Sequence, residues 1–136
     1  MYENTGLQEL KVYQKAYDFY KWSSVLISHF ARIHKYSLGI EIEKMIVHLI
    51  ADIVRAYYLS AKGKINKLNE CLVTLEIIQI HIRMGYEMCM SGGISAKNYE
   101  VASQKIDEIR KMIFAWRKSI HARETVECVH TASREG

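Results

Sequence analysis

The sequence contains no proline and only 7 glycines among its 136 residues. All-β sandwiches and barrels need many tight turns, which proline and glycine supply, so this composition nearly excludes them. Hydrophobic residues make up 49% and charged residues 25%, a balance typical of a globular domain rather than of a disordered chain. A chain of this length forms one domain and buries roughly two-thirds of its unfolded surface. A few long helices are therefore the expected architecture.

Long apolar segments and cysteine pairs are missing as well. No run approaches the ~20 residues of a membrane span, and no signal-peptide pattern opens the chain. Three cysteines occur in an odd and widely spaced set, at Cys71, Cys89 and Cys128. This set makes neither a disulfide framework nor a zinc pattern, and it fits a reducing compartment. We therefore expect a cytoplasmic protein without membrane contact.

Apolar residues recur with helical spacing in four segments. These segments span about residues 7–30, 37–61, 64–90 and 95–120. Ser37 and Ser95 are the expected N-caps of the second and fourth helices. Gly63 and the Ser91-Gly92-Gly93 loop are expected to end the second and third helices.

The loops between these helices are short, which makes successive helices antiparallel. We therefore predict an all-α fold, an antiparallel up-down four-helix bundle over residues 1–120. On the fourth helix the expected core stripe is Ala102, Ile106, Ile109, Ile113, Trp116 and Ile120. Residues 121–136 lose the periodicity and are rich in Thr, Ser, Arg and Glu, so we expect them to form a flexible C-terminal tail.

The second and third helices each carry two apolar stripes on nearly opposite faces. The expected inner stripes are Leu38, Ile42, Met45, Leu49, Ile53 and Ala56 on the second helix, and Leu68, Cys71, Leu75, Ile78, Ile82, Tyr86 and Cys89 on the third. The outer stripes are Ile40, Val47, Ala51, Val54 and Tyr58 on the second helix, and Val73, Ile77, Ile80, Met84 and Met88 on the third. A four-helix bundle buries one stripe per helix, so the outer stripes predict an interface between copies of the chain. The alternative is a wide core with a few exposed Ile and Val side chains, which is common in small numbers.

The six histidines and three cysteines form no pattern for catalysis or metal binding. The sequence has no HExxH motif and no Glu-x-x-His pair of the kind that a di-iron bundle needs. It has no phosphate-binding loop, GxSxG turn or dinucleotide fingerprint either. We interpret Cys71 and Cys89 as small hydrophobes of the inner stripe, and His48 as an edge or surface residue. We therefore predict no catalytic residue, no metal, no cofactor and no enzymatic activity.

The charge balance is mildly basic, with 19 Lys and Arg against 15 Asp and Glu. In a monomer, an ordinary solvated face with pairs such as Asp107–Lys111 explains the basic residues of the second half. In an oligomer each basic patch is repeated, and counterion release then favours binding to phosphate backbones with little dependence on base sequence. The candidate phosphate contacts are Lys62, Lys64, Lys67, Arg110, Lys111, Arg117 and Lys118.

A set of residues in one continuous register, from about 7 to 119, points to a known family. It opens with Leu10-Lys11-Val12-Tyr13-Gln14-Lys15-Ala16-Tyr17-Asp18 and continues through Lys67-Leu68, Leu75-Glu76, Ile82-Arg83, Ile94-Ser95, Tyr99, Glu108-Ile109, Met112 and Trp116. With these residues the chain resembles the accessory variability determinant (Avd) proteins of diversity-generating retroelements. The resemblance adds Arg83 as the best single candidate for a nucleic-acid contact, because it matches the family's Ile-Arg position and lies between the two stripes of its helix.

The resemblance implies a function that composition does not. Avd-like proteins form a homopentameric barrel of four-helix bundles, bind the reverse transcriptase of the element and nucleic acid, and are required for mutagenic complementary-DNA synthesis from the template-repeat RNA. The subunit itself has no catalytic activity. On this basis we expect a homopentamer that supports mutagenic retrohoming, with the reverse transcriptase, RNA and, as a further nucleic acid, DNA as its partners.

Two alternatives remain open. A sister family with the same helical bundle is encoded in intervening sequences of bacterial large-subunit ribosomal RNA, and it implies binding to RNA or ribosomes. That family usually carries an Asn-Ile-Ala-Glu-Gly-like stretch late in the second helix, where this chain has Ala51-Asp52-Ile53-Val54-Arg55-Ala56. The other alternative is a small helical-bundle enzyme that binds a ligand or a metal.

Overall fold

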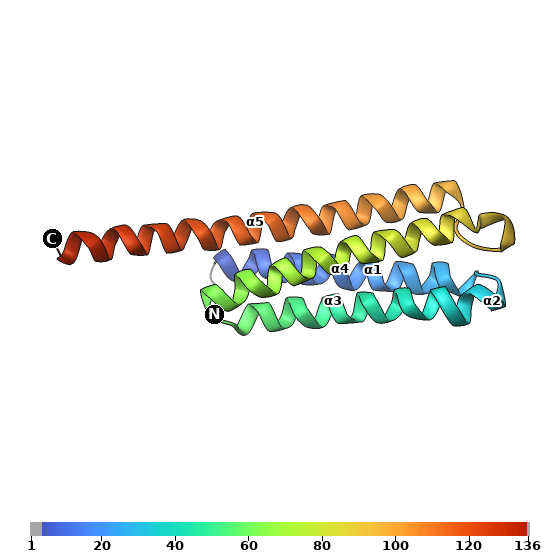
Figure 1. The fold of residues 1–136 in the computed structure, drawn as a ribbon, viewed down its shortest axis with the longest axis horizontal. Coiled ribbons are helices and arrows are strands. Elements are labelled where there is room, and N and C mark those ends of the chain that lie inside the picture. The colour runs from blue at the N-terminus through green and yellow to red at the C-terminus, as the bar shows by residue number, and fades with distance from the viewer. Residues whose placement is uncertain (1–3, 136) are drawn as a thin grey trace.

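Seven helical elements make up the described part of the chain in the computed structural model (Figure 1). The structure describes the backbone of residues 4–135 and the side chains of residues 10–88 and 90–124. The long helices are α1 (Asn4–Ser28), α3 (Ile40–Tyr58), α4 (Ala61–Glu87) and α5 (Ala96–Glu135). The short elements are α2 (Arg32–His34), the π-helical turn η1 (Lys35–Gly39) and the 3-10 turn η2 (Cys89–Ser91). No strand occurs between residues 4 and 135, and the predicted all-α class is confirmed.

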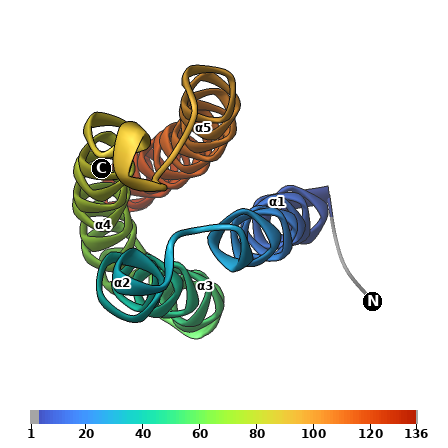
Figure 2. The same ribbon diagram turned by 90° about the vertical axis from the view of Figure 1, so that its right-hand side faces the viewer.

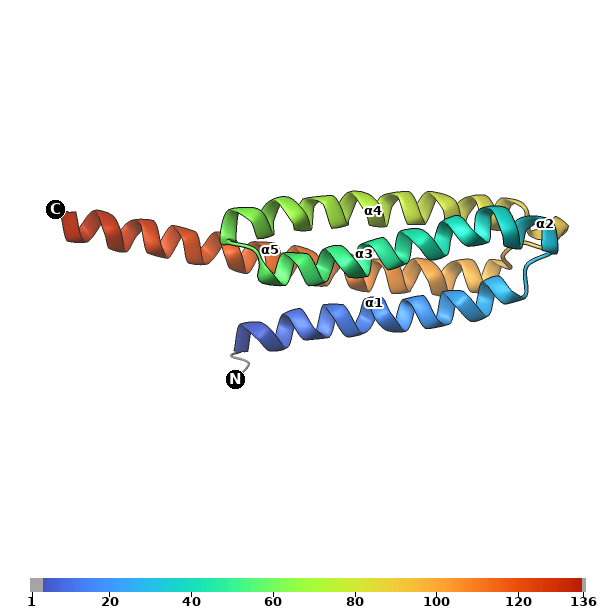
Figure 3. The same ribbon diagram turned by 90° about the horizontal axis from the view of Figure 1, so that it is seen from below.

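The four long helices run antiparallel in chain order and pack around a common core (Figures 1 and 3). Helices α1 and α4 each pack against both α3 and α5, which gives the cyclic order of an up-down bundle. Figure 2 shows this order in a view along the bundle. The α1–α3 and α4–α5 connections lie together at one end, which we call the tip. The α3–α4 connection lies at the opposite end, which we call the turn end.

The core consists of the inner faces of the four long helices. On α5 every residue of the predicted core stripe is buried, from Ala102 to Ile120. On α3 and α4 the inner stripes are also buried over most of their length, whereas Met45 of α3 and Leu38, which lies in η1, are half-buried. Burying one large apolar side chain contributes about 1.5–3 kcal/mol, so these stripes determine which face of each helix turns inward.

The inner stripe of α4 changes near the tip, where Gly85 rather than Tyr86 faces the core. A Cβ atom on Gly85 would lie 2.7 Å from Ile94 Cδ1, so the missing side chain makes room for Ile94. Tyr86 turns outward and stacks on Tyr99, with ring centroids 4.6 Å apart. The inner position expected for Tyr86 is therefore wrong, and the side chain of Cys89 lies outside the described residues.

The sequence predicts that two serines cap helices, and only one of them does. The Ser95 hydroxyl accepts a hydrogen bond from the Asn98 N–H at 3.2 Å, which confirms it as the N-cap of α5. Ser37 instead lies inside η1, where its hydroxyl donates to the carbonyl of Ile33 at 2.7 Å. The chain is already helical before Ser37, so its amide groups need no cap at that position.

The turn between α3 and α4 lies at residues 59–60, and Gly63 is inside the first turn of α4. Lys64 Nζ donates hydrogen bonds to the carbonyl oxygens of Ala56, at 3.0 Å, and Tyr57 at the end of α3. A cation at a helix C-terminus satisfies carbonyls that the helix leaves open and interacts favourably with the helix dipole. The expectation that Gly63 ends the helix is therefore wrong, because a lysine side chain terminates α3 first.

Helix α5 continues to Glu135, well past the predicted helix end near Ile120. No proline or glycine occurs between Ala96 and Glu135, so this segment contains neither of the residues that most often end a helix. The helix therefore extends beyond the α3–α4 connection (Figures 1 and 3). The flexibility of residues 121–136 stays a prediction. Among the helices described, none combines the length and the apolar character needed to cross a bilayer.

Candidate functional site

The outer stripes of α3 and α4 lie on the surface of the single chain. On α3, Val47, Val54 and Tyr58 are 51%, 41% and 80% exposed, whereas Ile40 and Ala51 are half-buried. On α4 the side chains of Val73, Ile77, Ile80 and Met84 are between 41% and 59% exposed. The exposure that the two opposed stripes predict for a monomer is thus confirmed. Which molecule covers these stripes stays a prediction.

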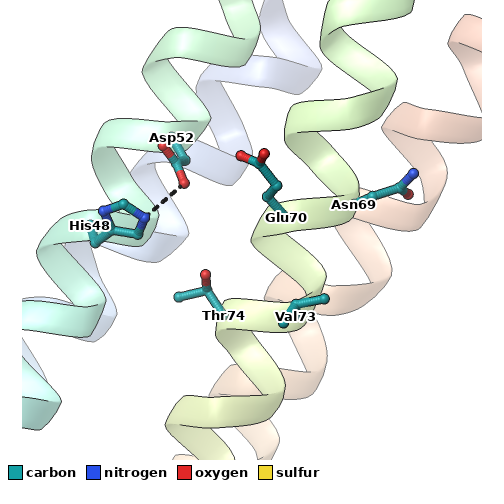
Figure 4. A pocket seen from close by; sticks show the side chains of 6 residues that line it. All are labelled: His48, Asp52, Asn69, Glu70, Val73 and Thr74. Atoms are coloured by element: carbon teal, nitrogen blue, oxygen red, sulfur yellow. Dashed lines mark ion pairs between the residues drawn. The ribbon is translucent and has the colours of Figure 1, made fainter.

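A polar groove of about 400 Å³ lies between α3 and α4 (Figure 4). It is lined by His48, Asp52, Asn69, Glu70, Val73 and Thr74. The carboxylate of Asp52 is buried beneath the groove, with its Oδ2 3.1 Å from His48 Nε2. Its Oδ1 accepts a hydrogen bond from Arg55 at 3.0 Å and lies 3.9 Å from Lys67 Nζ. Two cations and an imidazole therefore offset the cost of burying one carboxylate.

Asp52 was not singled out from the sequence, although the sequence contains a signal for it. His48 precedes it by four residues and Arg55 follows it by three, the two spacings that bring side chains together on a helix. Asp52 also follows Leu49 by three residues and precedes Ala56 by four, so it lies on the same face of the helix as the inner stripe. An acidic residue beside the core with basic neighbours at these spacings predicts the network.

The network changes the titration of two neighbouring groups. Burial, and after it the Asp52 carboxylate, raises the pKa of the Cys71 thiol to about 12. The hydrogen bond to Glu70, at 2.8 Å, raises the pKa of Lys67. Cys71 is therefore a neutral thiol near pH 7 and cannot act as a thiolate nucleophile.

The ion pairs around Asp52 are better suited to holding α3 and α4 together than to catalysing a reaction. A His–Asp pair can orient a general base, but catalysis also needs a reacting group within hydrogen-bond reach of the imidazole. The described side chains place no hydroxyl in such a hydrogen bond with His48. They also contain no group of three or more His, Cys, Asp or Glu that could hold a metal ion. The contact from Lys67 on α4 to Asp52 on α3 makes the network a link between the two helices.

Four of the predicted nucleic-acid contacts are already paired with carboxylates. The pairs are Arg83–Glu87, Arg110–Glu76, Arg110–Asp107, Lys111–Asp107 and Lys67–Glu70, with N···O distances between 2.8 and 3.3 Å. Surface pairs of this kind contribute little to stability, but each carboxylate lowers the positive potential that a phosphate would meet. These four residues therefore present less free charge than the sequence alone indicates.

Three other candidates, Lys62, Arg117 and Lys118, form no ion pair with any described carboxylate. Arg117 is held by neutral groups instead: it donates to Asn69 Oδ1 at 2.7 Å, and its guanidinium lies 4.9 Å from the centroid of the Phe114 ring. An arginine that neutral partners hold in position keeps its full charge and its flat donor face for a phosphate.

The candidate residues do not all gather at one place. Lys64 lies 5.9 Å from the Trp116 ring and Arg117 contacts Asn69, so the start of α4 and the middle of α5 meet at the turn end. We call Lys62, at the start of α4, and Arg117 and Lys118, on this part of α5, the turn-end cluster. Arg83 lies roughly 24 Å from Lys67 along α4, at a rise of 1.5 Å per residue, and is separate from this cluster. Lys64 has a different role, since it terminates α3.

Comparison with known families gives a match over most of the chain. A family model described as bAvd-like matches residues 10–120, a range that includes the whole of α3 and α4, α1 from Leu10 onward and α5 as far as Ile120. No curated protein and no solved structure matches the sequence.

Proposed function

The chain belongs to the bAvd-like family, the Avd-type proteins of diversity-generating retroelements, and we propose that it is a cytoplasmic, non-enzymatic accessory protein that binds the reverse transcriptase and the template RNA of its element. The family match over residues 10–120 is the observation that carries this proposal. Proteins of this family are of an accessory kind and are not catalysts. The contact with the reverse transcriptase rests on family membership alone.

The turn-end cluster supports binding to nucleic acid. Lys62, Arg117 and Lys118 carry charge that no described carboxylate neutralises. Contacts of this type go to phosphates and release condensed counterions, so the affinity should fall steeply with salt and depend little on base sequence. DNA would therefore bind at the same cluster as RNA.

The outer stripes support assembly of several copies. The stripe of α3 and the stripe of α4 lie on different helices, and the polar groove with His48 and Asp52 runs between these helices. One copy can therefore place its α3 stripe on the α4 stripe of the next. A head-to-tail contact of this kind closes into a ring when its rotation is right, and the family leads us to propose five subunits. In such a ring the turn-end cluster is repeated once per subunit.

A salt titration of RNA binding, with the oligomer mass measured by light scattering in the same buffers, tests the proposal. We expect a multi-subunit assembly that binds a structured RNA tightly at low salt and loses affinity steeply as salt rises. A stable oligomer that ignores RNA at low salt would contradict the RNA-binding part. Preference for large-subunit ribosomal RNA over template-repeat RNA would favour the ribosomal sister family instead.

The variant that locates the site is Lys62→Ala/Arg117→Ala/Lys118→Ala. We expect its RNA affinity to fall by at least about tenfold, with a salt dependence shallower by ~0.7–0.9 for each phosphate contact that is lost. The matched control is Lys15→Ala/Lys21→Ala/Lys44→Ala, which removes the same charge from three lysines that are paired with Glu108, Asp18 and Glu41. Equal losses in the two variants would mean that only net charge matters and that the cluster is not the site.

A further inference from the structure

The tip of the bundle carries three large apolar side chains that are among the most exposed described. Ile33 is 75% exposed, Tyr36 is 63% exposed and Met90 is 99% exposed. Ile33 and Tyr36 lie in the α1–α3 connection, and Met90 lies in the α4–α5 connection, at the same end of the bundle (Figure 2). We call these residues, together with Arg32 and Lys35, the tip surface.

A hydrogen bond between the two connections holds the backbone under the tip surface in place. The Ala31 N–H donates a hydrogen bond to the Gly92 carbonyl at 2.9 Å, which joins the two connections. Gly92 has a φ of 85°, a conformation that favours glycine. A Cβ atom there would lie 2.5 Å from Ala31 Cβ, so the two connections approach this closely only because residue 92 is glycine. The backbone that carries the tip surface is therefore part of the folded bundle.

The charge of the tip surface has one sign. No Asp or Glu occurs between Phe19 and Ile40 or between Met88 and Tyr99. Arg32 and Lys35 form no ion pair with any described carboxylate. Lys35 Nζ lies 5.9 Å from the centroid of the Tyr36 ring, so a cation and an exposed aromatic ring stand side by side. This combination differs from the paired cations on the sides of the bundle.

We propose that the tip surface binds unpaired nucleotides of single-stranded nucleic acid. A base stacks on the exposed ring of Tyr36, its neighbours pack against Ile33 and Met90, and the flanking phosphates contact Arg32 and Lys35. Proteins that hold single strands combine exposed aromatic rings with basic side chains in this way, and the stacking tolerates any base. The inference builds on the proposed nucleic-acid binding but adds a second contact, at the opposite end of the bundle from the turn-end cluster.

Charge favours nucleic acid over another copy of the chain as the occupant. Two tip surfaces placed together would bring Arg32 and Lys35 of one copy against the same residues of the other, and like charges oppose such a contact. A nucleic acid supplies the negative charge that the surface lacks, and flat bases that can stack on the ring of Tyr36. The tip surface therefore complements single strands, whereas a duplex hides its bases from Tyr36.

The test compares Tyr36→Ala with Tyr36→Phe, which keeps the ring. The probe is a fluorescein-labelled, unstructured RNA of about 15 nucleotides, measured by fluorescence anisotropy beside the same sequence as a duplex. We expect Tyr36→Ala to weaken single-strand binding about tenfold and Tyr36→Phe to stay within about twofold of the unmodified protein. Duplex binding should stay unchanged in both, because it depends on the turn-end cluster.

Tyr17→Ala is the matched control. Tyr17 is also exposed and also has a lysine over its ring, with Lys21 Nζ at 5.1 Å, but that lysine pairs with Asp18. We expect this variant to bind both probes normally. Single-strand affinity that is unchanged in Tyr36→Ala, while the turn-end triple variant loses it, would overturn the tip site and leave the proposed function intact.

Two further outcomes would also overturn the tip site. Failure of the unmodified protein to bind either probe removes the tip site and the proposed RNA binding together. A change of oligomer mass in Tyr36→Ala, seen by light scattering without a change in single-strand affinity, would assign the tip surface to a contact between proteins.

Discussion

Arg110 and Arg117 lie one heptad apart on the same edge of α5, yet they have opposite surroundings. Arg110 pairs with Glu76 of α4 at 2.9 Å and with Asp107 at 3.3 Å. Arg117 meets Asn69 of α4 at 2.7 Å and Phe114 at 4.9 Å. The α4 partners, Glu76 and Asn69, are themselves one heptad apart. Asp107 and Phe114, which precede the two arginines by three positions, are also one heptad apart. The same geometry therefore occurs twice, once with acidic partners and once with neutral partners.

The difference shows that the partners of a basic residue decide whether its charge is available. A count of Lys and Arg treats Arg110 and Arg117 alike, although carboxylates neutralise one of them and leave the other positive. Counterion release on binding nucleic acid requires cations that are free to meet phosphates. Arg117 satisfies this condition, and Arg110 does so only after its carboxylates are removed.

The largest expected effect comes from the most strongly paired carboxylate, Asp52. Asp52→Asn keeps the shape but removes the negative charge that meets His48, Arg55 and Lys67. We expect the free energy of unfolding to fall by about 1–3 kcal/mol, because buried hydrogen bonds to a charged group are lost. The measurement is urea unfolding followed by circular dichroism.

The control for Asp52→Asn is Asp107→Asn, which removes an exposed carboxylate from Arg110 and Lys111. Its free energy of unfolding should change by about 0.5 kcal/mol or less, as for other surface pairs. Equal changes in the two variants would show that burial does not distinguish the Asp52 network from surface pairing.

An exchange of partners on α4 gives an intermediate effect. Asn69→Glu places a carboxylate beside Arg117, and we expect RNA affinity to fall about three- to fivefold because one phosphate contact is neutralised. Glu76→Asn frees Arg110 from one carboxylate and should raise the affinity by about twofold, since Asp107 still holds it. Fluorescence anisotropy with labelled RNA measures both changes.

The double variant Asn69→Glu/Glu76→Asn keeps the net charge of the protein. We expect it to bind RNA more weakly than the unmodified protein, because the charge at Arg117 matters more than that at Arg110. An affinity equal to that of the unmodified protein would refute a distinct role for Arg117.

The smallest expected effect concerns Cys71, whose thiol pKa is raised in part by the charge of Asp52. Its pKa is raised from 9.0 to about 12, so the folded chain keeps this proton at pH values where the unfolded chain releases it. The stability that the protonated thiol contributes is therefore fully present below pH 9 and is lost as the pH rises toward 12. We expect no alkylation of Cys71 by iodoacetamide at pH 9 in the folded protein and rapid alkylation in urea, followed by peptide mass spectrometry.

The variant Asp52→Asn separates the two causes of the raised pKa of Cys71, burial and the charge of Asp52. Removing the carboxylate, which is the second cause of the raised pKa, should make Cys71 react somewhat faster at pH 10. The same rate in both proteins would mean that burial alone sets the pKa of the thiol.

The periodicity of the sequence predicts the core well and the helix ends poorly. The stripe from Ala102 to Ile120 is buried as expected, because apolar burial is the largest favourable term and recurs along the whole helix. Helix ends depend on single contacts, such as Lys64 on the carbonyls of α3 or the hydroxyl of Ser37 turned back into η1. Such contacts join residues whose approach is known only once the chain has folded.

In the candidate site, too, the sequence predicts features that lie within one helix and not contacts between helices. The outer stripes could be predicted because each lies within one helix, and their exposure is confirmed. The pairing of Arg110 with Glu76 joins residues of two helices, and helix periodicity does not give the register between them. The tip surface is not predicted for a related reason, since Tyr36 and Met90 lie in two connections that are far apart in the sequence and are joined by the Ala31–Gly92 hydrogen bond.

The repeated Arg110–Glu76 and Arg117–Asn69 contacts also specify how α4 and α5 align. An apolar stripe that repeats every seven residues fits almost as well after a slip of one heptad, so the core alone discriminates weakly between alignments. A slip in one direction would set Arg110 against Arg83, and a slip in the other would set Arg117 against Lys62. Both misalignments bring like charges together, and only the native alignment gives each arginine a partner that accepts its hydrogen bond. Arg110 and Arg117 therefore help to fix the register between α4 and α5.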